Sequence, residues 1–240
     1  MALVAGVDGC PAGWIAVLRD TAVAGSERVV VTSRFADLIE AGPAVIAVDM
    51  PIGLPDRIGP GGRGPETALR PHLGERQSSV FSVPSRSAVY AMDYREACTL
   101  AAATSDPPRK VSKQAFFLFP KIREIDGLLL ARADLRGRVF ESHPEGVFMT
   151  LNDGMALSEP KKVKGKCWPD GMALRRRLLA KAGVDAALLA MPTPRGAGED
   201  DLLDAVACSV TAGRILRGEA RSFPERPGID AFGLPVAIWA

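Results

Sequence analysis

Two short apolar runs that each end in an aspartate constrain the fold of this chain most. Residues 3–7 (Leu-Val-Ala-Gly-Val) lead into Asp8, and residues 44–48 (Ala-Val-Ile-Ala-Val) lead into Asp49. An uninterrupted apolar run of this length is typical of a strand that is covered on both faces of its sheet. Carboxylates at the ends of such strands lie on the rim of the sheet, where α/β folds bind their ligands.

The pattern around these runs predicts the order of the first elements. A turn-rich segment separates the first run from a second apolar run at 14–18, and a third lies at 28–32. Because the first connection is short, the first two strands are expected to form a hairpin. Ser33 is a favoured N-cap for a brief helix that ends near Ile39. The opening is therefore predicted to run strand, strand, strand, helix, strand.

The rest of the chain is predicted to be mainly helical, which gives an α/β fold class. A segment dense in glycine and proline at 50–75 predicts a long loop. Further on, apolar residues recur at the three- and four-residue spacing of helices. The elements expected there are helices at 93–103, 112–130, 172–181 and 199–217, a strand at 138–141 and a loop at 142–145.

Composition excludes several classes of protein. With 47% hydrophobic and 24% charged residues, the chain is typical of soluble globular proteins. No apolar run approaches the roughly 18 residues of a spanning helix, and the apolar start lacks a basic lead, so neither a membrane segment nor a signal peptide is expected. The four cysteines form no Cys-x-x-Cys pair, and there are two histidines. A closed zinc site is therefore disfavoured, and the reducing cytoplasm is the expected location.

A third acidic group opens the last predicted helix. Asp201 and Asp204 are three positions apart, so both face one side of that helix. If this helix end lies beside Asp8 and Asp49, the carboxylates repel one another unless a cation is present. Hard divalent ions such as Mg²⁺ or Mn²⁺ prefer oxygen ligands and suit this set. Helix capping is the alternative explanation for Asp200 and Asp201, whereas Asp204 lies too far along the helix for capping alone.

A second cluster of titratable residues follows the predicted fifth strand. Glu141 and Glu145 flank His143 in the segment Phe-Glu-Ser-His-Pro-Glu. This segment is a candidate source of a fourth metal ligand and of a proton-transfer group, because an imidazole beside a metal site can orient or deprotonate a water. A structural role for the histidine is the alternative.

Basic segments alternate with acidic ones along the chain. Residues 160–181 carry eight Lys or Arg and one acidic residue, although the net charge of the whole chain is only +2. Acids that converge on a site ringed by bases are the layout of a metal-dependent enzyme with a phosphorylated substrate, and a solvated lysine-rich face is the alternative. The candidates for binding phosphate oxygens are Lys113, Lys121, Arg86, Lys161 and Lys162.

Several motifs occur in one order over nearly the whole chain. They are Gly-Val-Asp-Gly-Cys-Pro-Ala-Gly-Trp at 6–14, Val-Asp-Met-Pro-Ile-Gly-Leu-Pro at 48–55, Ser-Ser-Val-Phe-Ser-Val-Pro-Ser-Arg at 78–86, Ser-Lys-Gln at 112–114, Pro-Lys-Ile-Arg-Glu-Ile-Asp at 120–126, Glu-Ser-His-Pro-Glu at 141–145 and Asp-Asp-Leu-Leu-Asp-Ala at 200–205. In these motifs the chain closely resembles the predicted RNase H-like nuclease family catalogued as domain of unknown function 429. The resemblance implies a ribonuclease H-like mixed sheet flanked by helices. It implies one domain, with a core at 1–53 and 137–240 and a large insertion after the fourth strand at 54–136.

The resemblance also implies a metal site and a class of activity. Asp8, Asp49, Asp201 and Asp204 would be the metal ligands, and the insertion would cover the site and select the substrate. The leading hypothesis is a nuclease or phosphodiesterase that uses two Mg²⁺ or Mn²⁺ ions, one to activate water and one to stabilise the leaving oxygen. The substrate would be a nucleic acid or a phosphorylated small molecule, without a membrane partner. The oligomeric state stays open, a homodimer included.

Two other functions are compatible with the sequence. An ATPase or kinase of the same superfold would place the Asp8-Gly9 hairpin against nucleotide phosphates, although the chain is short for a two-lobed enzyme of that kind. A non-catalytic binding protein would keep the fold and use its proline-rich loops for a partner. Dinucleotide binding is disfavoured, because the glycines at 6–13 do not match the fingerprint and a strand follows where that motif needs a helix.

Overall fold

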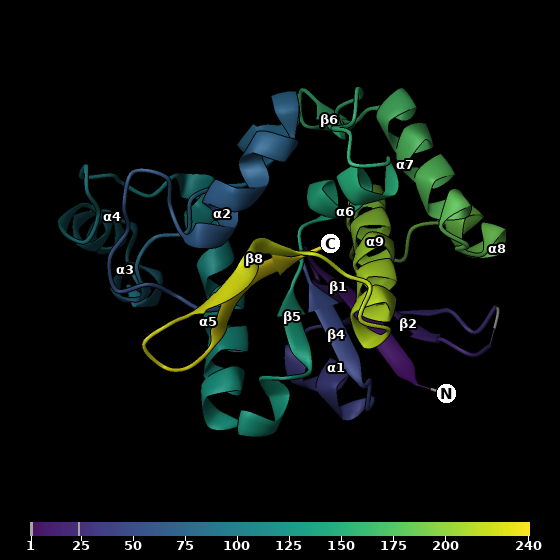
Figure 1. The fold of residues 1–240 in the computed structure, drawn as a ribbon, viewed down its shortest axis with the longest axis horizontal. Coiled ribbons are helices and arrows are strands. Elements are labelled where there is room, and N and C mark those ends of the chain that lie inside the picture. Colours follow the sequence, from purple (N-terminus) through teal and green to yellow (C-terminus); the bar gives the residue numbers. More distant parts are fainter. Residues whose placement is uncertain (1, 24) are drawn as a thin grey trace.

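A five-stranded mixed sheet forms the centre of the computed structural model, which describes residues 2–23 and 25–240 (Figure 1). Its strands lie in the order β3-β2-β1-β4-β5. Neighbouring strands pair antiparallel from β3 to β1 and parallel from β1 to β5. The strand bounds are β1 Leu3–Cys10, β2 Gly13–Asp20, β3 Arg28–Thr32, β4 Val45–Val48 and β5 Val139–Glu141.

Helices flank this sheet on both faces, which confirms the predicted α/β class. Side chains of α9 pack on one face, and side chains of α1 and α5 pack on the other (Figure 1). The helix bounds are α1 Phe35–Glu40, α2 Gly64–Leu69, α3 Arg86–Tyr90, α4 Tyr94–Ala103, α5 Lys113–Ala131, α6 Pro144–Leu151, α7 Pro169–Lys181, α8 Ala186–Ala190 and α9 Glu199–Leu216. Among the described residues, none of the helices combines the length and the apolar character needed to cross a membrane.

Alternation along β1 sends successive side chains to opposite faces of the sheet. Ala5 and Val7 are buried in the cluster that includes α1 and α5. Val4 is buried instead with residues of α9. Asp8, an even-numbered residue of the same strand, therefore lies on the α9 face, at the end of β1.

Gly6 allows α9 to lie directly on β1. A Cβ atom at this position would lie 1.9 Å from the backbone nitrogen of Ser209 and 2.2 Å from the carbonyl oxygen of Ala205. Both distances are far below van der Waals contact, so a larger residue would push the helix away from the strand. The close approach brings the first turns of α9 to the edge of the sheet at which β1 ends.

Most predicted elements are confirmed. The chain opens as strand, strand, strand, helix, strand, and α4, α5, α7 and α9 lie where helices were predicted. The predicted N-cap of the first helix is wrong by one position, because Arg34 rather than Ser33 precedes α1, and no side chain caps it. The 90 residues between β4 and β5, 49–138, contain α2 to α5.

The segment at 50–75 is not the continuous loop that its composition predicted. It contains α2 and a short 3₁₀ helix at Arg70–His72. Pro65 lies in the first turn of α2, where its missing N–H leaves no hydrogen bond unmade. The Glu66 side chain accepts a hydrogen bond of 2.6 Å from the backbone N–H of Arg63, which precedes the helix. The same proline that indicated a loop thus begins a helix.

Two further parts differ from the prediction. The expected loop at 142–145 is the start of α6, with His143 at its N-cap and Pro144 in its first turn. A C-terminal hairpin was not predicted at all; it is formed by β8 Ser222–Ile229 and β9 Pro235–Trp239. Trp239 of this hairpin bridges to Ser142, so the end of the chain lies beside the end of β5.

Candidate metal centre

Three carboxylates from three separate elements meet at one edge of the sheet. Asp8 lies in β1, Asp49 follows β4 directly, and Asp204 lies in the second turn of α9. Each offers a carboxylate oxygen, and these oxygens all lie within 4.8 Å of one another. We call these residues the carboxylate triad. They come together because β1 and β4 are parallel neighbours and α9 packs closely on β1.

Burial makes the negative charges of the triad costly. Asp8 is 8% exposed and Asp204 is 1% exposed, so bulk water screens neither of them well. Burial, together with the charges of Asp49 and Asp204, raises the pKa of Asp8 well above its usual value. Burial likewise raises the pKa of Asp204 to about 6, although Lys161 lies beside it. A cation within the triad would remove this cost.

Asp204 has a free acceptor for such a cation. Its Oδ2 atom contacts the ammonium group of Lys161. Its Oδ1 atom is buried and has no hydrogen-bond partner among the described residues. A buried carboxylate oxygen without a partner is unfavourable, and cations with oxygen ligands supply what it lacks. The triad can therefore hold a metal ion.

Asp201, the other predicted ligand on α9, lies outside the triad. Its carboxylate accepts a hydrogen bond of 2.8 Å from the backbone N–H of Gly198 and so caps the helix. Asp200 forms ion pairs with Lys162 at 2.6 Å and Lys161 at 3.6 Å. Burial alone would raise the pKa of Asp200, but the two lysines lower it below its usual value. The capping explanation thus describes Asp201 well, and Asp204 alone of the three reaches the triad.

Glu141 lies near the triad, but its oxygens are already occupied. One accepts a hydrogen bond of 2.6 Å from the Arg63 guanidinium, and the other accepts one of 2.8 Å from the Ile52 N–H. Arg63 is also 2.7 Å from Glu66 and donates to the carbonyls of Ile52 and Gly53. We call Arg63, Glu66 and Glu141 the arginine cluster. Its contacts make Glu141 a structural residue that fixes the loop after β4.

Glu145 and His143 also lie near the triad, in α6 and at its N-cap. Glu145 is buried and forms an ion pair with the fully buried Arg175 of α7. The imidazole of His143 is partly exposed, with Nε2 3.4 Å from the carbonyl of Ser79. Burial raises the pKa of Asp49, and the electrostatic influence of the nearby His143 opposes that rise. His143 is therefore placed to interact with a group bound at Asp49, whereas Glu145 is held by its arginine.

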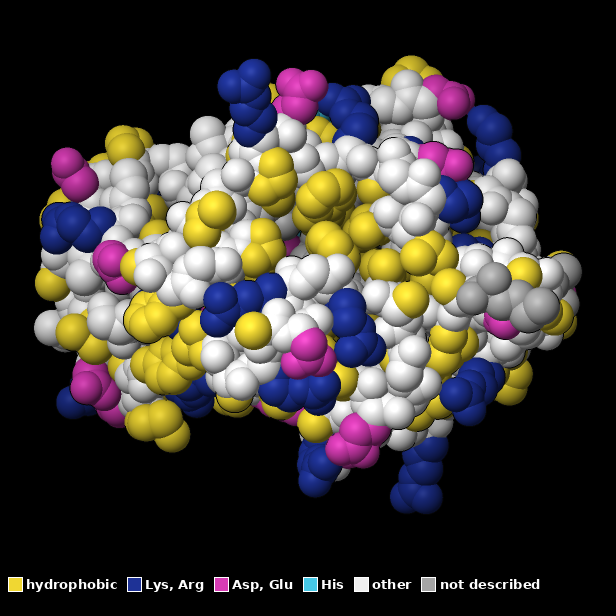
Figure 2. All heavy atoms as spheres, turned by 60° about the horizontal axis from the view of Figure 1, so that its bottom comes forward, with side chains coloured by type: hydrophobic (Ala, Val, Ile, Leu, Met, Phe, Trp, Pro, Cys, Tyr) yellow, Lys and Arg dark blue, Asp and Glu magenta, His cyan; other side chains and the backbone are white. Residues whose placement is uncertain are grey.

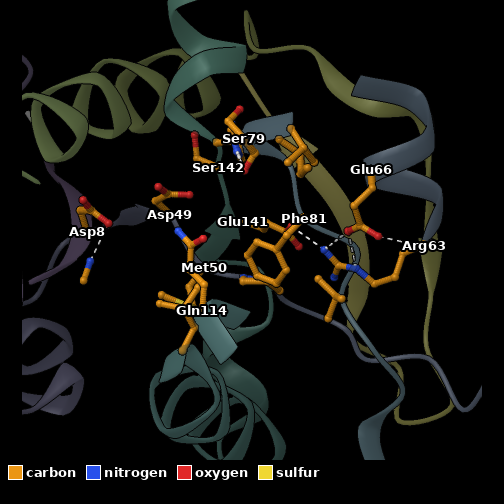
Figure 3. A pocket seen from close by; sticks show the side chains of 17 residues that line it. Asp8, Asp49, Met50, Arg63, Glu66, Ser79, Phe81, Gln114, Glu141 and Ser142 are labelled. Atoms are coloured by element: carbon orange, nitrogen blue, oxygen red, sulfur yellow. Dashed lines mark hydrogen bonds and ion pairs between the residues drawn. The ribbon is translucent and has the colours of Figure 1, made fainter. Parts of the chain in front are cut away.

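A cavity of about 190 Å³ adjoins the triad. Asp8 and Asp49 lie at one side of it and Arg63 and Glu66 at the other, with Glu141 and Phe81 between them (Figure 3). Its walls are partly apolar, and polar side chains reach it from several elements. The other lining residues are Gly9, Met50, Pro51, Ser79, Val80, Val83, Gln114, Leu118, Ser142, His143 and Ile238. The cavity can therefore admit a small group from solvent to the triad.

The basic residues proposed for phosphate binding are placed differently from one another. Arg86 forms ion pairs with Asp126 and with Asp230, 2.7 Å away, and so joins α5 to the C-terminal hairpin. Lys121 donates to the carbonyls of Cys10 and Gly13. Neither side chain lines the cavity. Arg86 and Lys121 therefore stabilise the fold through contacts with residues far away in the sequence, which local sequence patterns could not reveal.

The three remaining lysines lie in two places. Lys161 and Lys162 reach the acidic end of α9, as described above. Lys113 begins α5 and is exposed, next to Gln114, which lines the cavity. Lys113 is thus exposed and is the chain neighbour of a residue that lines the cavity.

Comparison with known proteins assigns the chain to a family. A family model described as "Protein of unknown function (DUF429)" matches residues 6–228. The chain belongs to this family. No curated protein and no solved structure matches it. The DUF429 match contains the whole carboxylate triad, the arginine cluster and His143, and it ends within β8.

Two buried arginines of this DUF429 protein were missed in the sequence. Arg63 lies in a segment rich in glycine and proline, and Arg175 lies in a run of three arginines, where surface exposure is the usual expectation. The signal for Arg63 was the glutamate three positions later, which forms part of the helix start. For Arg175 no local signal exists, because its partner Glu145 is 30 positions away.

Proposed function

We propose that this DUF429 protein is a nuclease or phosphodiesterase that depends on Mg²⁺ or Mn²⁺ bound by Asp8, Asp49 and Asp204. The observation that carries the proposal is the buried carboxylate triad, with an unpartnered oxygen on Asp204, beside an accessible cavity. Oxygen ligands suit these hard cations. In hydrolases that act on phosphate esters, such ions activate water and stabilise the charge that develops on the leaving oxygen.

The proposed fold is RNase H-like. The family resemblance implies this fold, and the order strand, strand, strand, helix, strand supports it. The positions of the acids support it as well, since they lie on the first strand, after the fourth strand and on the last long helix. These are the positions at which the resemblance places metal ligands, except that Asp201 caps α9.

The residues around the triad hold the loop that carries Asp49 and transfer protons. In the hydrolysis, water loses a proton as its oxygen bonds to phosphorus. The bond to the leaving oxygen breaks, and that oxygen keeps the electron pair and takes up a proton, so that one proton passes overall from the water to the leaving group. His143 lines the cavity and is the residue that we assign to this proton transfer, because imidazole exchanges protons near neutral pH. The arginine cluster fixes the loop that carries Asp49 through Glu141 and Arg63.

The volume of the cavity and the distribution of basic side chains on the surface indicate which substrates are favoured. A volume of about 190 Å³ accommodates one small group, such as the end of a strand or a single phosphoester. On the face shown in Figure 2, Lys and Arg side chains are dispersed among hydrophobic and acidic ones. Duplex binding relies on many phosphate contacts from basic side chains. Because the cavity is small, we place a single-stranded end or a phosphorylated small molecule ahead of a long duplex as the substrate.

Thermal unfolding with and without millimolar Mn²⁺ or Mg²⁺ tests the metal site. The melting temperature of the wild type is expected to rise with the ion, because the ion binds the folded triad and not the unfolded chain. The rise is expected to be lost in Asp8→Asn. Asp201→Asn is the matched control, since this carboxylate caps α9 and its loss should leave the rise intact.

Hydrolysis assays then separate the functional alternatives. Bis(p-nitrophenyl) phosphate and end-labelled single-stranded RNA and DNA should be cleaved with Mn²⁺ by the wild type and not by Asp8→Asn. Stabilisation by ATP with Mg²⁺, without cleavage of any diester, would indicate the ATPase or kinase instead. A wild type that neither the ions nor the substrates stabilise would contradict the proposal and favour a binding protein.

A further inference from the structure

Lys161 places a positive charge directly on the triad. Its ammonium group contacts Asp204 Oδ2 and lies 3.6 Å from Asp200 Oδ2. Burial alone would lower the pKa of Lys161, but the charges of Asp204 and Asp8 outweigh burial and raise it. Among the described residues, Lys161 is the one side chain that forms an ion pair with a carboxylate of the triad.

The backbone of Lys161 is fixed rather than loosely tethered. Its carbonyl accepts a hydrogen bond of 2.9 Å from the N–H of Trp168. On the preceding residue, the carbonyl of Pro160 lies so close to Gly171 of α7 that a Cβ there would be 1.9 Å away. One position earlier, the carbonyl of Glu159 accepts a hydrogen bond of 3.2 Å from Arg175. These contacts hold the lysine against the acidic end of α9 instead of leaving it in solvent.

Three other charged groups near the triad already have partners. Glu145 pairs with Arg175, and Asp200 pairs with Lys162 at 2.6 Å. Asp201 accepts the N-cap amide of α9. When the triad is fully ionised, as metal binding requires, its three carboxylates carry three negative charges, and the ion pair with Lys161 offsets one. Two charges remain, which is the charge that one divalent ion neutralises.

We propose that Lys161 is a built-in cation of the metal centre and that the triad binds one divalent ion rather than two. This inference rests on the proposed function and replaces its two-ion form. The two oxygens of Asp204 would have different partners. Oδ2 would stay paired with Lys161, and the unpartnered Oδ1 would bind the ion. Lys161 then supplies the second positive charge that a two-ion enzyme obtains from its second metal.

The experiment counts bound Mn²⁺ by isothermal titration calorimetry and by the loss of the free-ion electron paramagnetic resonance signal. The wild type is expected to bind one ion per chain. Lys161→Met frees Asp204 Oδ2 and restores the third negative charge, so this variant is expected to bind two. Lys162→Met is the matched control, because this neighbouring lysine pairs with Asp200 alone, and it should still bind one ion.

Each outcome decides between this inference and the function on which it rests. Two ions in the wild type would overturn the inference and leave the proposed function standing. One ion in Lys161→Met, whatever its affinity, would overturn the role assigned to the lysine. No ion in the wild type would instead contradict the metal-dependent function itself. Because the wild-type count needs no substitution, it decides between one ion and two even if Lys161→Met fails to fold.

Discussion

The carboxylate triad and the arginine cluster both contribute side chains to one cavity and handle buried charge in opposite ways (Figure 3). In the arginine cluster, the guanidinium of Arg63 donates to two carboxylates and two carbonyls. In the triad, Asp204 keeps a buried oxygen without a partner among the described residues, and Lys161 forms the one ion pair that they make with the triad. Saturated buried charge holds a structure together, whereas unsaturated buried charge indicates a ligand.

The largest loss of folding stability is expected from removing the guanidinium of the arginine cluster. Arg63→Met leaves Glu66 and Glu141 buried without it, which typically costs about 3–5 kcal/mol of folding free energy. Urea unfolding measures the loss. Arg132→Met is the control, because Arg132 and its partner Asp134 are about half exposed and solvent screens such pairs, so this variant should lose little stability. Equal losses in the two variants would refute a structural role for the cluster.

The second prediction concerns metal, which should bind at the triad and not at the arginine cluster. Mn²⁺ at 100 times its dissociation constant should stabilise the wild type by about 2.7 kcal/mol. Asp204→Asn should lose this gain, whereas Glu66→Gln should keep it, because Glu66 belongs to the arginine cluster. Denaturant unfolding with Mn²⁺ or with chelator measures both. A gain that persists in Asp204→Asn would exclude the triad as the binding site.

Stability should also depend on pH through the triad. The pKa of Asp204 is about 6 in the folded protein against 3.8 for the free side chain, so the folded state holds a proton that the unfolded chain releases. Without metal, stability should therefore fall between about pH 4 and pH 6–7, by on the order of 2 kcal/mol from this residue. Comparing the wild type with Asp204→Asn across that range isolates the contribution. Identical slopes would show that Asp204 does not titrate as described.

The smallest loss of stability is expected from a change at Asp201, and it tests whether this residue caps α9 or binds metal. Asp201→Asn should cost about 0.3–1 kcal/mol, because the charge at the N-terminus of α9 is lost while a side-chain acceptor remains. The stabilisation by Mn²⁺ should be unchanged. A loss of metal binding in this variant would instead show that Asp201 is a metal ligand in addition to the triad.

The sequence predicted the triad better than its surroundings, for physical reasons. Asp8 and Asp49 were visible because a carboxylate after an apolar strand is a local pattern, and Asp204 because capping cannot explain its position. The sequence did not separate Asp201 from Asp204, since that depends on how α9 meets β1 through Gly6. The partners of Glu141 and Glu145 were hidden because they are 78 and 30 positions away.

In the fold too, elements with a local sequence pattern were predicted and elements that depend on long-range pairing were not. The helices with regular apolar spacing were predicted well. The C-terminal hairpin was not, because β8 contains Pro224 and Pro227, and proline within a run argues against a strand. This strand pairs only with β9, so it tolerates residues that a central strand excludes.

The three carboxylates of the triad are drawn from positions 8, 49 and 204. During synthesis the first two can meet early, when β1 and β4 pair, but the third is translated much later. A nascent chain therefore lacks the complete triad until α9 has docked. Metal binding at the triad would follow the docking of this helix.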